Sequence, residues 1–92
     1  MEAKFIAAWQ KNRNAAAILG VRMRPVEADA LKQAKRILSG NRLSDGFNDL
    51  AAQGQLKLSL EALVVSREFT PLFTDEEANE ALTRLLEAGY GF

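Results

Sequence analysis

Six basic residues suited to binding an anionic partner lie in the N-terminal half of the chain. They are Arg22, Arg24, Lys32, Lys35, Arg36 and Arg42. Arginine and lysine bind carboxylates and phosphates through charge-assisted hydrogen bonds, and contacts to nucleic-acid phosphates give a salt-sensitive affinity. We therefore predict that these six residues contact a partner protein or a nucleic acid. The opposing interpretation is a solvated helix face, and the zero net charge of the chain favours it over nucleic-acid binding.

The charges are unevenly distributed along the chain. Residues 1–43 contain nine basic and three acidic residues, a net charge of +6, and residues 44–92 contain the reverse, a net charge of −6. Because opposite charges steer association, we predict a small non-enzymatic protein–protein interaction module that binds a partner or a second copy of itself. A contact between the basic half of one copy and the acidic half of another is head-to-tail. The alternative is a nucleic-acid-binding accessory or regulatory protein.

The composition restricts catalytic chemistry, because the chain has neither cysteine nor histidine. Thiolate nucleophiles, imidazole bases and zinc sites built from these residues are excluded. No catalytic, metal or cofactor site is predicted from the remaining residues, and no small-molecule ligand is evident. The acidic cluster near residue 77 is interpreted as the start of a helix, where acids interact favourably with the helix dipole. Its members are Asp75, Glu76, Glu77 and Glu80.

The length and the hydropathy pattern predict one small domain spanning residues 1–92. No apolar run approaches the roughly 20 residues that cross a bilayer. The first residues lack the uninterrupted apolar block of a secretory signal. We therefore expect a cytoplasmic protein without membrane contact, in agreement with the absence of cysteine.

Two amphipathic helices are predicted most clearly. Thr74 and Glu77 form a capping-box pattern ahead of an apolar stripe, which predicts a helix over about 75–88 that ends before Gly89. A second helix is predicted over 26–38, with Pro25 just before it and Gly40 after it. We expect the apolar stripes of the two helices to pack against each other. The stripe of the 75–88 helix consists of Ala78, Ala81, Leu82, Leu85 and Leu86, and that of the 26–38 helix consists of Ala30, Leu31, Ala34, Ile37 and Leu38.

The N-terminal segment is also predicted to be helical, either as one helix or as two with Asn14 capping the second. Phe5, Trp9, Ala16 and Leu19 would lie along one face of it. Trp9 and Phe73 are expected in the core, whereas the tail residues Tyr90 and Phe92 are as well suited to an interface as to the core.

Shorter elements complete the predicted fold. Ser44 is predicted to cap a helix over 45–53, and Ser59 another over 60–68. Residues 21–24 and 55–60 alternate apolar and polar side chains, which is typical of strands, and the two runs are candidates to pair as a short two-stranded ribbon. The predicted fold class is therefore mainly α, a bundle of four or five helices with a possible β-ribbon.

Overall fold

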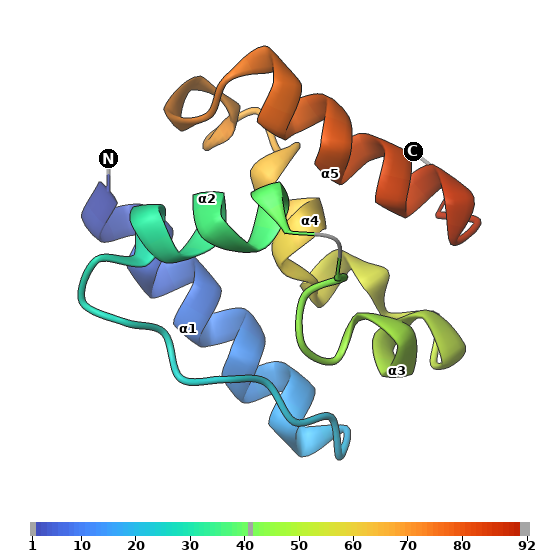
Figure 1. Cartoon of the computed structure of the whole chain (residues 1–92). Coiled ribbons are helices and arrows are strands. Elements are labelled where there is room, and N and C mark those ends of the chain that lie inside the picture. Colours follow the sequence, from blue (N-terminus) through green and yellow to red (C-terminus); the bar gives the residue numbers. More distant parts are fainter. Residues whose placement is uncertain (1, 41, 91–92) are drawn as a thin grey trace.

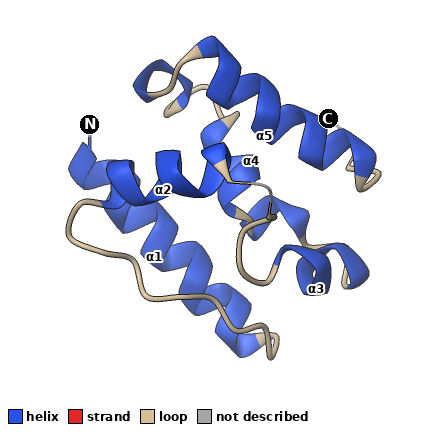
Figure 2. Ribbon diagram, in the orientation of Figure 1, coloured by secondary structure: helices blue, strands red, loops and turns tan. Residues whose placement is uncertain are grey.

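A computed structural model describes residues 2–40 and 42–90 of the chain, and these residues form helices joined by loops, the longest of which connects the first helix to the second (Figures 1 and 2). The prediction of a mainly helical fold with four or five helices is confirmed. The α-helices and the two 3₁₀ turns are α1 (Glu2–Ile18), α2 (Ala30–Ser39), α3 (Phe47–Ala52), η1 (Leu56–Leu58), α4 (Leu60–Val64), η2 (Thr70–Leu72) and α5 (Asp75–Glu87).

The predicted ribbon between 21–24 and 55–60 is wrong, since the described residues contain no strand. The backbone of 21–24 bonds to α1 instead: the Val21 N–H donates to the Ala16 carbonyl, and Arg13 Nε donates to the Met23 carbonyl. Residues 56–58 form the 3₁₀ turn η1, in which the Ser59 N–H donates to the Leu56 carbonyl at 3.0 Å. The Val21 N–H, the Met23 carbonyl and the Ser59 N–H therefore have partners other than a neighbouring strand.

α2 lies across the molecule and packs against both α1 and α5, while the short α4 packs against α1, η1 and α5 (Figure 1). The prediction that the helix in 26–38 packs against the helix in 75–88 is thus confirmed by the contact between α2 and α5. Leu85 is fully buried and Leu82 half-buried, but Leu86 is 56% exposed.

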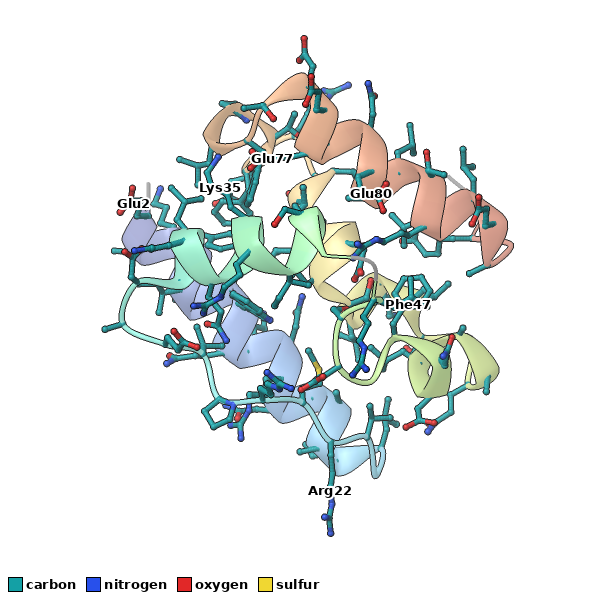
Figure 3. All side chains as sticks on the ribbon, viewed as in Figure 1. Glu2, Arg22, Lys35, Phe47, Glu77 and Glu80 are labelled. Atoms are coloured by element: carbon teal, nitrogen blue, oxygen red, sulfur yellow. The ribbon has the colours of Figure 1, made fainter. Side chains whose placement is uncertain are left out.

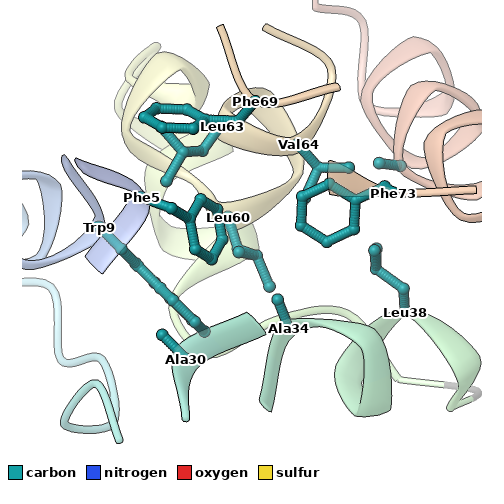
Figure 4. Packing of buried hydrophobic residues seen from close by; sticks show 11 residues of the cluster. Phe5, Trp9, Ala30, Ala34, Leu38, Leu60, Leu63, Val64, Phe69 and Phe73 are labelled. Carbon is teal, nitrogen blue, oxygen red and sulfur yellow. The ribbon is translucent and has the colours of Figure 1, made fainter. Parts of the chain in front are cut away.

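Phe5 is the centre of the larger hydrophobic cluster (Figure 4). Its ring centroid lies 5.7 Å from that of Trp9, 5.4 Å from that of Phe69 and 5.6 Å from that of Phe73. The prediction that Trp9 and Phe73 are core residues is therefore confirmed. A second cluster joins the end of α1 to α3, η1 and α5 through Ala16, Val21, Phe47, Leu50, Leu56 and Leu85.

The start of α5 agrees with the sequence, whereas the start of α2 does not. Thr74 accepts from the Glu77 N–H and Glu77 accepts from the Thr74 N–H, which completes the capping box. α2 begins only at Ala30, because Asp29 is its N-cap and accepts from the Lys32 N–H. Pro25 therefore lies before the helix, and the predicted start at residue 26 is wrong.

The remaining elements correct several predictions. α1 is one continuous helix, so Asn14 caps nothing, and Leu19 is 39% exposed rather than buried with Phe5. Ser44 does not cap α3; Gly46 occupies that position. Ser59 caps α4 as predicted, but the helix ends at Val64 instead of residue 68.

Tyr90 is half-buried against the second cluster, and Phe92 lies outside the described residues. None of the helices in the described part of the chain is both long and apolar enough to span a membrane.

Candidate functional site

A pocket of about 550 Å³ opens between α1, α2 and the loop that leads to α3. Its volume lies within the range of known ligand pockets. The apolar part of its lining consists of Trp9, Met23, Ile37, Leu43 and Leu60. Trp9 and Leu60 are core residues, so one side of the pocket is a continuation of the larger hydrophobic cluster.

Three of the six predicted contact residues, Arg24, Arg36 and Arg42, line this pocket. Arg24 Nε lies 2.9 Å from Asp45 Oδ2, and Arg36 Nη2 lies 3.2 Å from Glu27 Oε1. Both pairs are open to solvent, with the arginine side chains 79% and 62% exposed. Exposed pairs of this kind contribute about 0–1 kcal/mol, so another carboxylate can replace either acid at little cost.

Arg42 is exposed, and no ion pair joins it to any residue that the structure describes. It is adjacent in sequence to Leu43, which is itself 38% exposed. A guanidinium and an exposed apolar side chain thus both line the pocket.

The other three predicted contact residues do not line the pocket. Lys35 Nζ lies 2.7 Å from Glu77 Oε1 and 5.2 Å from the centre of the Phe73 ring, so a carboxylate and an aromatic ring already engage it (Figure 3). Arg22 projects away from the body of the molecule (Figure 3). Lys32 is an exposed residue in the first turn of α2. The structure therefore separates the six residues into a pocket group and three others.

Two buried polar residues of the pocket were missed in the sequence. Gln33 accepts from the Glu27 N–H at 2.8 Å and donates to the Pro25 carbonyl at 3.2 Å, which holds the 25–27 segment against α2. Ser44 donates to Glu61 Oε1 at 2.5 Å, and its N–H donates to Glu61 Oε2 at 3.2 Å. The burial of Gln33 could have been predicted from its position three residues after Ala30, which places it on the apolar face of the helix.

A buried ion pair holds the loop that forms one side of the pocket. Glu61 is fully buried and lies 3.1 Å from Arg84 Nη1, and Arg84 is only 6% exposed. Arg84 Nη2 also donates to the Gly40 carbonyl at 3.0 Å. Gly40 and Ser44 both line the pocket. The buried Glu61–Arg84 pair therefore positions two of the lining residues through hydrogen bonds from the protein interior.

Two of the four acidic residues at the start of α5 have structural partners. Glu77 completes the capping box and Glu80 pairs with Arg84 at 2.9 Å. Burial is the largest influence on the Glu77 carboxyl and raises its pKa. The hydrogen bonds from Lys35 and Thr74, together with the Lys35 charge, outweigh that effect, so the pKa of Glu77 lies below its ordinary value. No group of three or more acidic side chains that could hold a metal ion occurs in the described ranges.

Comparison with known proteins gives no relative from which a role could be transferred. Searches with protein-family models, against curated proteins and against solved structures found no match to this chain.

Proposed function

We propose that the protein is a non-enzymatic interaction module whose pocket receives an apolar anchor side chain from an acidic segment of a partner protein. The observation that carries this proposal is the combination of an apolar lining with three arginines in one pocket. The anchor would contact Trp9, Ile37 and Leu43, and the flanking carboxylates would bind the guanidiniums.

The apolar lining provides the attraction for the anchor. Transferring a Leu- or Phe-sized side chain from water into an apolar site is worth about 1.5–3 kcal/mol. Binding energy in protein interfaces concentrates at such anchors, which lie in pockets surrounded by polar groups. Leu43 is exposed in the free chain, so covering it adds to the same gain.

The arginines supply the preference for an acidic segment. Arg42 has no carboxylate among the described residues, and the pairs of Arg24 and Arg36 are weak enough to exchange. A guanidinium binds a carboxylate through two parallel hydrogen bonds, which favours carboxylates at fixed positions beside the anchor. A basic or neutral segment would gain nothing from this rim.

Nucleic-acid binding is less well supported as a function of the same residues. The net charge of the chain is zero, whereas nucleic-acid-binding domains are usually basic, and the apolar lining of the pocket offers nothing to a phosphate backbone. The proposal includes a cytoplasmic location, which the cysteine-free composition favours.

The test uses the fluorescence of Trp9, the single tryptophan of the chain, which lines the pocket. The probe is the acetylated, amidated peptide DDELFEDD, and the titration is made at about 50 mM salt, where exposed charges are weakly screened. We expect a saturable change in emission that weakens as salt is raised. The peptides DDEAAEDD, without the anchor, and KKRLFRKK, with reversed charge, should not produce it.

Charge reversal within the pocket gives the decisive comparison. The double variant R36E/R42E should lose at least tenfold in affinity for DDELFEDD, equivalent to about 1.4 kcal/mol. R22E is the matched control, because Arg22 is exposed outside the pocket, and it should bind like the unaltered chain. The proposal is wrong if no saturable change occurs, if R22E weakens binding equally, or if a short DNA duplex binds while the peptide does not.

A further inference from the structure

We infer that the pocket of one copy receives the C-terminal turn of α5 from a second copy, so that the chain associates with itself head to tail. This inference rests on the proposed function, because it needs the pocket to accept an apolar side chain beside a carboxylate. The segment of α5 in question carries Leu82, Leu86 and Glu87.

α5 presents the chemistry that the pocket fits. Leu86 is 56% exposed, and Leu82, one turn earlier on the same side of the helix, is half-buried. Glu87 follows directly and is exposed, and no ion pair joins it to another described residue. An exposed leucine, with a half-buried leucine one turn before it and a carboxylate directly after it, is the arrangement required of an anchor for a pocket lined by arginines.

The pocket of the same molecule cannot receive this segment. Arg84 points toward α2, where it donates to the Gly40 carbonyl on the lining of the pocket. Leu86 follows two residues later, which places it about 200° around the helix axis from Arg84. The anchor side chain therefore faces away from its own pocket, and only another molecule can bring the two together.

Charge selects Leu86 over the other exposed apolar side chains. Ile18 is 87% exposed, but it lies in the half of the chain with a net charge of +6, close in sequence to Arg22. Leu86 lies in the half with a net charge of −6, and the exposed side of α5 also carries Asp75 and Glu76. The basic rim therefore attracts α5 and repels the end of α1.

The geometry of the contact determines the kind of assembly. The pocket and the anchor are different surfaces, so each copy that donates α5 still has an open pocket. The C-terminal end of α5 lies at the edge of the molecule, where a second copy can reach it (Figure 1). Association then closes into a ring of copies, of which a reciprocal dimer is the smallest, or continues as an open chain.

Sedimentation velocity over a range of protein concentrations tests this inference. The unaltered chain should form species larger than a monomer as concentration rises, and both L86E and R36E/R42E should remain monomeric. I18E is the matched control, an equally polar change at an exposed apolar residue in the basic half, and it should associate like the unaltered chain. Thermal melts of each variant verify that the fold is intact.

Mixing the two monomeric variants gives the most specific result. R36E/R42E keeps an intact α5 and L86E keeps an intact pocket, so an equimolar mixture should form a 1:1 complex and nothing larger. A chain that stays monomeric at all concentrations overturns the inference, as does association that survives L86E. If DDELFEDD still binds that monomer, the proposed function stands; if the peptide also fails, the proposed function is wrong as well.

Discussion

Arg84 is an arginine within the apolar stripe of α5, and its hydrogen bonds explain how it can be buried there. It donates to Glu61 and Glu80 and to the carbonyls of Ile37, Leu38 and Gly40. Glu61 accepts from Ser44 as well as from Arg84, and the buried side-chain polar atoms of the described residues all have partners. The network thus joins α2, α4, α5 and the loop at residue 44.

Removing Arg84 should be far more costly than removing an exposed arginine. R84A leaves Glu61 buried without its cation, and breaking a buried pair in this way costs about 3–5 kcal/mol. R36A removes an exposed pair and should change the free energy of unfolding by about 1 kcal/mol or less. Urea denaturation of the two variants measures the difference. Equal losses from both would show that the buried network does not stabilise the fold.

Glu77 gives a prediction about pH. Its pKa is lowered in the folded chain, so its charge stabilises the fold above the ordinary glutamate pKa of about 4.3 and loses that effect as pH falls through the folded value. E77Q retains a side chain that can accept in the capping box but removes the charge beside Lys35.

At pH 7 the unaltered chain should be more stable than E77Q by about 0.5–1 kcal/mol, a value limited by solvent screening. The two stabilities should converge as pH falls below about 4. Denaturant curves recorded from pH 3 to 7 measure this, and a difference that persists unchanged to the lowest pH contradicts the assignment.

At the scale of elements, Gly46 begins α3 in a conformation that favours glycine and in a confined place. Its φ is +80°, and a Cβ there would lie 2.7 Å from Val21 Cγ1 and 3.2 Å from the Arg22 carbonyl oxygen. Gly54 has a similar φ of +68°, but a Cβ would meet nothing within 4 Å. A substitution at Gly54 therefore tests backbone strain alone, whereas a substitution at Gly46 adds steric contact to that strain.

G54A should destabilise the fold by about 1–2 kcal/mol, the cost of a left-handed conformation for alanine. G46A adds the displacement of Val21 to that cost and should lose a further 1–3 kcal/mol, roughly the cost of overpacking a core. Differential scanning calorimetry of both variants compares them. A G46A variant as stable as G54A would mean that the 21–24 segment moves aside freely.

The elements that were predicted correctly are those with local causes. The capping box of α5 lies within four residues, and its stripe follows from the helical repeat, so both were visible in the sequence. The start of α2 could not be predicted from the sequence, because Gln33 binds the backbone of Pro25 and Glu27 and holds these residues outside the helix. Ser44 suits a cap by type, but Glu61, seventeen residues away, uses its hydroxyl instead.

The candidate site was predicted only in part for the same reason. The basic residues could be chosen by type, yet only tertiary structure brings Arg24, Arg36 and Arg42 around one pocket. Trp9 was predicted as a core residue, and it is also part of the pocket because the core extends to that surface. No sequence pattern joins α1 to the loop at residue 42.

At the scale of the whole molecule, folding neutralises only part of the separation of charge between the two halves. Arg24–Asp45 and Lys35–Glu77 join the basic half to the acidic half within one chain. Arg42 on the pocket and Glu87 on α5 are exposed and remain available to other molecules.

The most direct test of the central claim is a ¹H–¹⁵N NMR titration of the chain with the peptide DDELFEDD, recorded on L86E to suppress self-association. The account predicts that the largest shifts fall on the Trp9 indole, the Gln33 side-chain amide and the backbone of Leu43, with Arg22 and Lys32 unaffected. Shifts centred on Arg22 and Lys32, or the absence of any shift at Trp9, would contradict it.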